Sequence, residues 1–185
     1  SLILLMAVVL VGCGATPKTD KPLPKDFKSL KALAEKGDVR AQVTLGVMYD
    51  NGEGVEEDLK EAVKWWRKAA EQGYAAGQDN LGYAYSTGRG VPKDDKEAVK
   101  WYRKAAEHGN ASGQYSLGAM YALGEGVPED GVTAYAWMNI AAVNGSHDAK
   151  GFKNDIEQTL TSGQIAKAEA LAKEMIAKNP KLLRK

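Results

Sequence analysis

Apolar residues in the middle of the chain follow a helical period. Leu81 and Tyr85 stand four residues apart, with Gly77 four positions earlier. After the intervening segment 86–94, a stripe at spacing i, i+3, i+7 and i+8 comprises Ala98, Trp101, Ala105 and Ala106. Residues at these spacings lie on one face of an α-helix. The pattern therefore predicts two helices joined by a turn.

The same helix pair occurs three times, because equivalent residues recur every 36 positions. They are Gly37, Gly73, Gly109 and Gly145; Leu45, Leu81 and Leu117; Gly46, Gly82 and Gly118; Tyr49, Tyr85 and Tyr121; Val55, Val91 and Val127; Asp58, Asp94 and Asp130; Trp65, Trp101 and Trp137. A period of this length is typical of a solenoid, in which each unit buries its apolar face against its neighbours. We expect an all-α fold, an α/α solenoid (superhelix) of antiparallel helix pairs with three full repeats over residues 38–145.

The glycine-rich turn has a folding role. Gly88 and Gly90 can adopt positive φ, which ends the first helix and reverses the chain. Asp94 can then cap the second helix, with Glu97 at the capping-box position three residues later. Gly82 lies inside a predicted helix, where glycine costs about 1 kcal/mol relative to alanine. Its recurrence in every repeat predicts that two helices approach closely there.

The C-terminal part differs from the repeats in a way that predicts a cap. Ile140 stands where the preceding repeat has Lys104, so we expect an apolar segment to cover it. Residues 146–180 have the required helical spacing and are interpreted as C-terminal capping helices, which a solenoid needs at its ends. Thr161 and Gln164 form a capping-box pattern at the start of the last helix.

Three segments precede the first repeat. Residues 1–13 contain an unbroken apolar run, too short to span a bilayer as a helix, and are interpreted as a secretory signal segment whose true start lies upstream. Residues 14–25 are rich in proline and small polar residues, which predicts a flexible tether. Residues 26–37 match only the second helix of a repeat, an N-terminal half-repeat with one apolar face formed by Phe27, Leu30 and Ala34.

The segment "LVGC" at the end of the apolar run resembles the lipobox of bacterial lipoproteins. It contains the single cysteine of the chain, Cys13. The resemblance implies that Cys13 is lipidated and becomes the mature N-terminus. A residue other than aspartate after the cysteine, here Gly14, implies the outer membrane. A plain cleaved signal or an inert thiol is the alternative interpretation.

The repeats resemble the Sel-one-like repeat (SLR) family, relatives of the tetratricopeptide solenoids. The pattern A-x-x-x-L-G-x-x-Y-x-x-G-x-G-V-x-x-D-x-x-x-A-x-x-W-x-x-(K)-A-A-E-x-G is read from Ala41 to Gly73 and twice more, with Gly77 and Gly113 in place of the first alanine. The resemblance implies an α/α superhelix used for protein–protein interaction. The cysteine-rich secreted branch of the family is a poor match, because no cysteine pairs punctuate the repeats.

Composition and motifs give no indication of catalysis. The motifs H-E-x-x-H, G-x-S-x-G, S-x-x-K and C-x-x-C are absent, and His108 and His147 are far apart and interpreted as solvent-facing. The 25 basic and 24 acidic residues leave a net charge of +1 and alternate along the second helices. That mixture is typical of a solvated surface and not of a nucleic-acid interface. We expect no catalytic residue, metal, cofactor or nucleic-acid partner.

A partner-binding groove is expected on the first helices. Aligning the L-G-x-x-Y core with tetratricopeptide units places partner-contacting side chains on one face of each first helix, at spacings that keep them together. These groove residues are Arg40, Val43, Val47 and Asp50; then Asp79, Tyr83 and Ser86; then Ser112, Tyr115 and Ala119. Tyr83 and Tyr115 are either exposed aromatics of the kind enriched at binding hot spots or packing residues between neighbouring repeats.

The expected function is a non-enzymatic scaffold or adaptor of the bacterial cell envelope. It would be a monomer, tethered by its lipid to the periplasmic face of the outer membrane, and would bind a partner protein or peptide in the concave groove. One alternative is a surface-exposed or released lipoprotein that binds a host protein. Another is a cell-wall hydrolase-like enzyme or an activator of one, suggested only by the cysteine-rich relatives.

Overall fold

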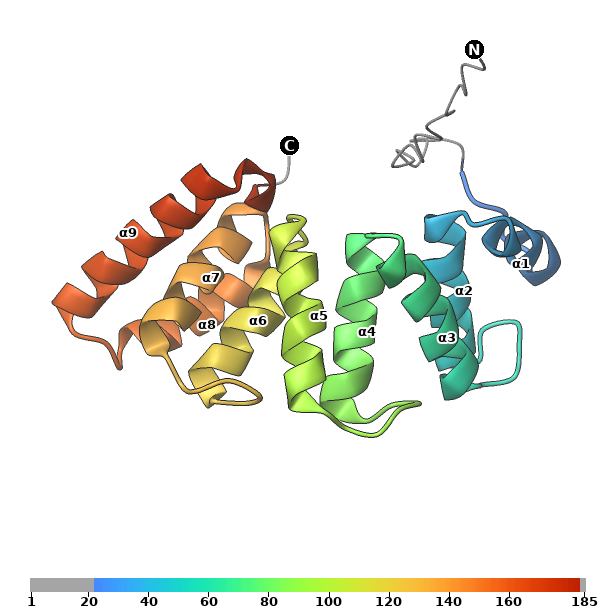
Figure 1. Ribbon diagram of the computed structural model, residues 1–185, viewed down its shortest axis with the longest axis horizontal. Coiled ribbons are helices and arrows are strands. Elements are labelled where there is room, and N and C mark those ends of the chain that lie inside the picture. Colours follow the sequence, from blue (N-terminus) through green and yellow to red (C-terminus); the bar gives the residue numbers. More distant parts are fainter. Residues whose placement is uncertain (1–21, 184–185) are drawn as a thin grey trace, which may run out of the picture.

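The computed structural model describes residues 22–183, so Cys13, the lipobox and most of the predicted tether lie outside the described residues. From residue 22 to residue 183 the secondary structure is entirely helical, and the helices follow one another in an elongated array (Figure 1). They are α1 (Phe27–Glu35), α2 (Val39–Asn51), α3 (Leu59–Glu71), α4 (Ala75–Thr87), α5 (Asp95–Glu107), α6 (Ala111–Leu123), α7 (Gly131–Val143), α8 (His147–Glu157), α9 (Ser162–Lys178) and the 3-10 turn η1 (Pro180–Leu182).

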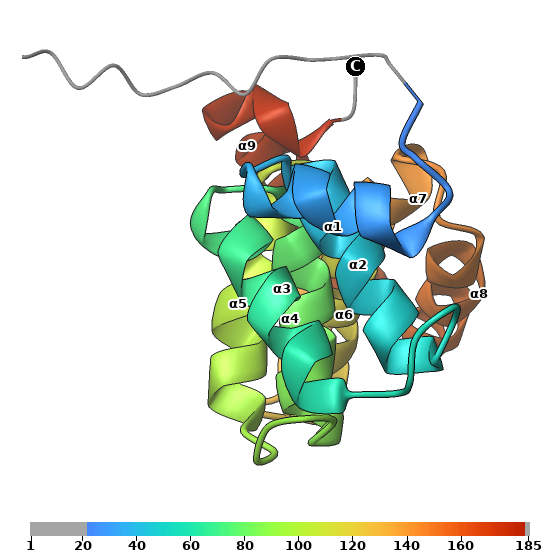
Figure 2. The same ribbon diagram turned by 90° about the vertical axis from the view of Figure 1, so that its right-hand side faces the viewer.

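The helices form two rows. Helices α2, α4 and α6 are the first helices of the repeats and pack against the second helices α3, α5 and α7, which in turn contact the next first helix. Helices α2, α4, α6 and α8 also contact one another in succession, so they form the row with the tighter spacing. In a curved array the tighter row lies on the inside. Seen along the array, successive helices lie one behind another (Figure 2), and the predicted α/α solenoid is confirmed.

The second helix of each repeat begins at its predicted aspartate cap. Asp58 accepts hydrogen bonds from the amides of Lys60 and Glu61, both at 3.0 Å. Asp130 makes the equivalent pair of bonds, whereas Asp94 accepts only from the amide of Glu97. The predicted reciprocal bond from the glutamate does not form: Glu61 pairs with Lys64 at 2.6 Å, and Glu97 pairs likewise with Lys100. Side chains three residues apart are neighbours on a helix surface, so the lysine offers the glutamate carboxylate a charged partner. The capping box at the start of α9 is confirmed.

The turn glycines have the predicted left-handed conformation. Gly88 has φ of 77° and Gly90 has φ of 72°. The turn also has a role that the sequence did not predict, because any side chain at position 90 would collide with the carbonyl of Leu59, at the start of α3 in the preceding repeat. Gly90 therefore joins two repeats as well as reversing the chain.

Within each repeat, the glycine in the middle of the first helix receives a large side chain from the second helix. A Cβ at position 82 would lie 2.6 Å from Cδ1 of Tyr102, which confirms the predicted close approach. The sequence did not identify the partner, which lies 20 residues further along in every repeat. The three pairs are Gly46 with Trp66, Gly82 with Tyr102, and Gly118 with Met138.

A buried glutamine in each first helix connects successive second helices, a feature absent from the sequence prediction. Gln42, Gln78 and Gln114 donate through Nε2 to the carbonyls of Ala34, Ala70 and Ala106, at 3.0, 3.2 and 3.1 Å. Their Oε1 atoms face Gln72, His108 and Asn144, each at the C-terminal end of the following second helix. Because Nε2 of Gln78 is already a donor, Oε1 must accept, and Nδ1 of His108 must carry a proton. His108 is exposed, as predicted, but has a structural partner.

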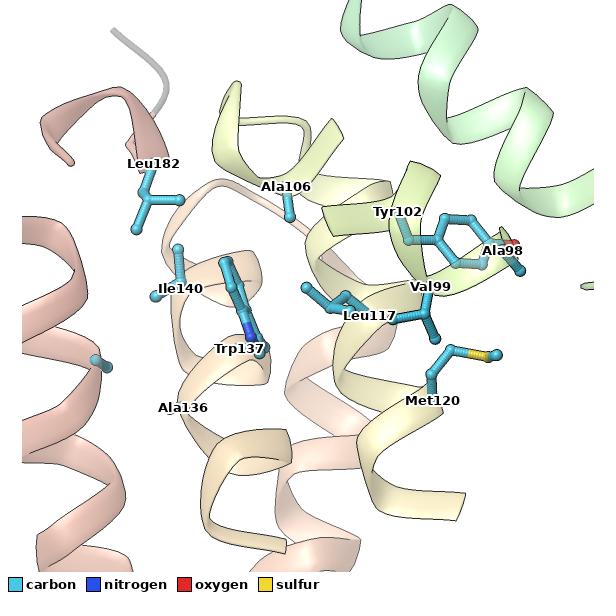
Figure 3. Packing of buried hydrophobic residues seen from close by; sticks show 11 residues of the cluster. Ala98, Val99, Tyr102, Ala106, Leu117, Met120, Ala136, Trp137, Ile140 and Leu182 are labelled. Atoms are coloured by element: carbon cyan, nitrogen blue, oxygen red, sulfur yellow. The ribbon is translucent and has the colours of Figure 1, made fainter. Parts of the chain in front are cut away.

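The C-terminal cap covers Ile140 as predicted, leaving it 1% exposed. Part of the cover comes from α9, which packs against α7. The rest comes from residues 179–183, here called the C-terminal strap, which places Leu182 beside Ile140 and Ala106 (Figure 3). The carbonyl of Leu182 accepts bonds from Gln114 Nε2 at 2.8 Å and Asn144 Nδ2 at 2.6 Å. The strap thus ties the cap to the third repeat.

Candidate partner-binding face

All ten predicted groove residues lie on α2, α4 and α6, the inner row of helices. We call these ten residues the inner face. Their exposure varies: Tyr83 is 45% exposed and Ser112 is exposed, whereas the other eight are partly buried. The helical spacing has therefore brought residues from three repeats to one side of the solenoid, with one large aromatic side chain open to solvent.

The two tyrosines of the inner face differ. Tyr115 is partly buried and packs edge-on against Phe152 of α8, with ring centroids 6.1 Å apart. The packing interpretation therefore holds for Tyr115, because α8 extends the inner row beyond the third repeat and covers it. The exposed interpretation holds for Tyr83. The two positions are also not equivalent, since Tyr115 corresponds to Asp79 in the second repeat and Val43 in the first.

An ion pair links the first two repeats at the inner face. Arg89, in the turn after α4, donates through Nη2 to Oδ1 of Asp50 at 3.0 Å and through Nε to the same oxygen at 3.1 Å. The carboxylate of Asp50 is largely buried, and Arg89 also reaches the Asp50 carbonyl. Asp50 is therefore engaged in holding the turn of the second repeat against α2.

Asp79 has a different environment. Its side chain is partly buried, with Ser112 of α6 nearby. Burial raises the pKa of Asp79 to about 6, while the Ser112 hydroxyl acts in the opposite direction. The carboxylate is therefore ionised at neutral pH but less firmly than a solvated one.

Tyr102 reaches the inner face from the second row. Its ring lies against Gly82, and its hydroxyl group is 3.1 Å from Oγ of Ser86. Burial raises its pKa to about 12, with the Ser86 hydrogen bond lowering it and the charge of Asp79 raising it. Tyr102 is not among the predicted groove residues because it belongs to a second helix. Gly82 is the sequence feature that could have indicated Tyr102, because the absence of a side chain at position 82 leaves room for the tyrosine ring between the helices.

The family comparison confirms the origin of these helices. The Sel1 repeat model matches residues 39–74, 75–110 and 111–146, and each match contains one first and one second helix. The chain belongs to the Sel1 repeat family. Proteins built from Sel1 repeats are generally protein–protein interaction scaffolds and are typically non-enzymatic. No curated protein matches the chain.

Three solved structures share the fold. A protective antigen of uropathogenic Escherichia coli strains that displays an SLR fold is 41% identical, with a TM-score of 0.77, over 84% of this chain. The chain spans only 33% of that protein. A Sel1 repeat protein from Oxalobacter formigenes is 43% identical, with a TM-score of 0.63, over 69% of this chain and 96% of its own. The Helicobacter pylori cysteine-rich protein B is 26% identical, with a TM-score of 0.56, over 68% and 95%.

Two pockets lie at the edges of the Sel1 repeats and were not predicted. One, of about 630 Å³, lies between the N-terminal ends of α4 and α6 and the C-terminal strap, beside Tyr74, His108 and Lys181. The other, of about 500 Å³ and mainly apolar, lies between α1 and the segment before it, next to Leu23 and Leu33. The inner face contributes only Arg40 to these pockets, at the rim of the second.

The described part of the chain offers little for other kinds of site. Among residues 22–183 there is no group of three or more His, Cys, Asp or Glu side chains that could hold a metal ion. Over the same residues no helix combines the length and apolar character needed to cross a membrane. Sel1 repeat proteins bind protein partners in general.

Proposed function

We propose that this chain is a non-enzymatic scaffold of the bacterial cell envelope that binds a segment of a partner protein on its inner face. The supporting observation is that packing positions repeat whereas inner-face positions do not. Leucine, glycine and tyrosine recur in each first helix, but the position of Asp79 holds Val43 in one repeat and Tyr115 in another. The packing common to the repeats does not fix the residue type at this position, so it can vary to match a partner.

Tyr83 is the centre of the proposed contact. Its side chain is exposed, aromatic and rigid. Side chains of this kind bury a large area on binding and lose little conformational entropy. Its exposed ring has no counterpart in the other repeats, where Val47 and Ala119 occupy the same position.

Site-specific photocross-linking in living cells tests this face. A photoreactive phenylalanine analogue at position 83 should yield a discrete adduct with the partner. The matched control is position 143, where Val143 is 66% exposed at the end of a second helix. An adduct that forms from position 143 and not from position 83 would move the binding surface off the inner face.

The lipid tether is part of the proposal. Cys13 follows an apolar run and precedes a proline-rich segment, the order in which a lipoprotein carries its anchor and its linker. We expect Cys13→Ser to leave the protein unprocessed or released from the membrane, as measured by envelope fractionation and intact mass. A variant of unchanged mass that still fractionates with the outer membrane would contradict the anchor.

The side of the membrane is a second question. The periplasmic face is our proposal, and surface exposure with binding to a host protein is favoured by the similarity to a protein described as a protective antigen. Protease treatment of intact cells separates the two, because only a surface-exposed chain is degraded.

We also propose a monomer, since α9 and the strap cover the apolar edge at Ile140; light scattering after gel filtration measures the mass.

A further inference from the structure

The C-terminal strap shows how a segment binds across the joint between two repeats. The carbonyl of Leu182 accepts hydrogen bonds from Nε2 of Gln114 at 2.8 Å and from Nδ2 of Asn144 at 2.6 Å. The strap also crosses Gly109, where a Cβ would lie 2.5 Å from the carbonyl oxygen of Lys181. The strap therefore binds through its backbone, at the edge of the solenoid where the second helices end and the next first helices begin.

The corresponding place one repeat earlier is open. It lies between residues 73–76 and residues 108–111, and we call it the open edge. Gly73 is equivalent to Gly109, but a Cβ at position 73 would meet nothing within 4 Å. The pocket of about 630 Å³ lies at this edge, with the strap as one of its walls. There is therefore space beside the strap for a second segment.

A buried glutamine at the open edge has a donor that the fold does not use. An amide nitrogen carries two hydrogens, and Nε2 of Gln114 donates to the carbonyls of Ala106 and Leu182. Gln78 is only 3% exposed, and its Nε2 donates to the carbonyl of Ala70 but to no second acceptor among residues 22–183. A buried donor without an acceptor is destabilising. A carbonyl placed as that of Leu182 is placed in the third repeat would remove this cost.

The walls of the pocket offer donors and a positive charge. The polar side chains that line it are those of Tyr74, His108, Asn110 and Lys181. Oδ1 of Asn110 accepts the bond that caps α6, which leaves its Nδ2 as a donor, and Lys181 is exposed. None of the described residues that line the pocket is an aspartate or a glutamate. The pocket therefore matches a ligand that has hydrogen-bond acceptors and a negative charge.

The side chain that an occupant would place beside α5 must differ from that of the strap. In the strap, Leu182 packs beside Ile140 (Figure 3). The residue equivalent to Ile140 in the second repeat is Lys104, which is exposed and lies with Nζ 3.9 Å from the centre of the Trp101 ring. A leucine there would face a cation, whereas an acidic side chain would find an opposite charge.

We propose that the open edge binds an extended segment of a partner protein that carries an aspartate or a glutamate. One backbone carbonyl of the segment accepts a hydrogen bond from Nε2 of Gln78, and its carboxylate faces the positive charge of Lys104 and Lys181. A second copy of the chain does not match, because its residues 181–185, "KLLRK", contain three basic side chains. The site is separate from the inner face and does not depend on binding there.

Peptide selection tests the open edge without knowledge of the natural partner. A phage library of random 12-residue peptides is selected on the full chain, and the enriched peptides are tested on Ala75→Trp, which fills the pocket. Position 75 tolerates a large side chain, because the equivalent residue of α8, His147, is exposed. The control Ser162→Trp places the same side chain at the first residue of α9, away from the pocket. We expect peptides that lose binding to Ala75→Trp only and that share an acidic position.

The charge of the pocket is tested by reversal. Lys181→Glu should weaken the binding of these peptides about fivefold or more, because an attraction between exposed charges is replaced by a repulsion. The control Lys173→Glu, on an exposed part of α9, should leave the affinity unchanged.

The side-chain amide of Gln78 reports directly on the proposed hydrogen bond. By NMR, hydrogen exchange of its unbonded N–H should slow on peptide binding toward the rate of Gln114, whose amide is bonded twice. Gln42 is the matched control, because its Nε2 also has one acceptor, the carbonyl of Ala34, but lies at the first joint. Its exchange should not change.

Several results would overturn the proposal. They are a selection without peptides sensitive to Ala75→Trp, sensitive peptides without a shared acidic residue or indifferent to Lys181→Glu, and an exchange rate of Gln78 that stays constant on binding. A Gln78 amide already protected in the full chain without peptide would mean that the chain itself or a second copy occupies the edge, and light scattering separates these two. Peptides sensitive to Tyr83→Ala and not to Ala75→Trp report on the inner face, so the two proposals fail separately.

Discussion

The seam inside each repeat and the inner face across the repeats are built from the same first helices, yet they differ in how far their side chains vary. At the seam, a glycine in the first helix meets a large side chain from the second in all three repeats. On the inner face, one position holds Val43, Asp79 and Tyr115 in turn. A residue at the seam is packed between the two helices of its repeat. A residue on the inner face is packed on one side and faces solvent on the other.

This difference indicates where a repeat protein can acquire specificity. A glycine at the seam cannot gain a side chain without overlapping its neighbour, so glycine recurs there opposite a large side chain, which is Trp66, Tyr102 or Met138. An inner-face residue can change its charge or size without affecting the contact between the two helices of its own repeat. The variable row is therefore where we propose that recognition takes place.

The largest expected effect comes from breaking the seam. Gly82→Leu would place its side chain inside the ring of Tyr102, and we expect the free energy of unfolding to fall by about 3 kcal/mol or more. The control is Gly151→Leu, where a Cβ would meet nothing within 4 Å; it should be neutral or slightly stabilising, since leucine favours helix more than glycine. Urea denaturation measures both, and equal stabilities would show that position 82 is not tightly packed.

The next effect concerns the glutamine bridges, which belong to the constant part of the molecule. Gln114→Leu should lower the free energy of unfolding by about 2 kcal/mol, because the buried carbonyls of Ala106 and Leu182 lose a donor. Gln42→Leu removes the donor from a single carbonyl, that of Ala34, and should cost less. A smaller loss for Gln114→Leu would indicate that the strap adds nothing to the third joint.

A substitution on the inner face should have the opposite sign. Because the folded pKa of Asp79 is raised from 3.8 to about 6, its ionised form disfavours folding. The stability due to the protonated form is fully present below pH 3.8 and is lost as the pH rises through 6. At about 1.4 kcal/mol per pKa unit the full shift would correspond to about 3 kcal/mol. Because the side chain is partly exposed to solvent, we expect Asp79→Asn to be more stable than the parent by about 2 kcal/mol at pH 7.5.

The pH profile separates this effect from a simple change of packing. Near pH 4 the gain of Asp79→Asn should shrink, because the parent carboxyl is then protonated in the folded state and increasingly so in the unfolded state. Thermal denaturation of both proteins between pH 4 and pH 7.5 provides the measurement. A constant difference across that range would mean that the carboxylate of Asp79 is not what destabilises the joint.

The smallest expected effect is local to a helix start. Asp58→Ala removes the cap that the amides of Lys60 and Glu61 share, and should lower the free energy of unfolding by about 1 kcal/mol. Peptide binding should be unaffected, because Asp58 lies at the turn and not on the inner row. A loss of binding in a folded Asp58→Ala protein would extend the recognition surface to the turns.

The sequence by itself determined the features that depend on residues close together in the chain. The 36-residue period, the helical stripes, the turn glycines and the aspartate caps all act within about one helical turn, so a pattern of residue types is enough to place them. The fold class followed, because identical units with an apolar face can bury it only by stacking. The ten inner-face positions came from the alignment with tetratricopeptide units, and their role in binding stays a prediction.

Only the tertiary structure decided which distant residues meet. That Tyr102 fills the space at Gly82, that Gln114 and Asn144 bind the strap through Leu182, and that α8 covers Tyr115 while Tyr83 stays exposed depend on the relative placement of whole helices. The environment of Asp79 is of the same kind. Its raised pKa comes from burial, with Ser112 of α6 acting in the opposite direction, and no local pattern around position 79 records either.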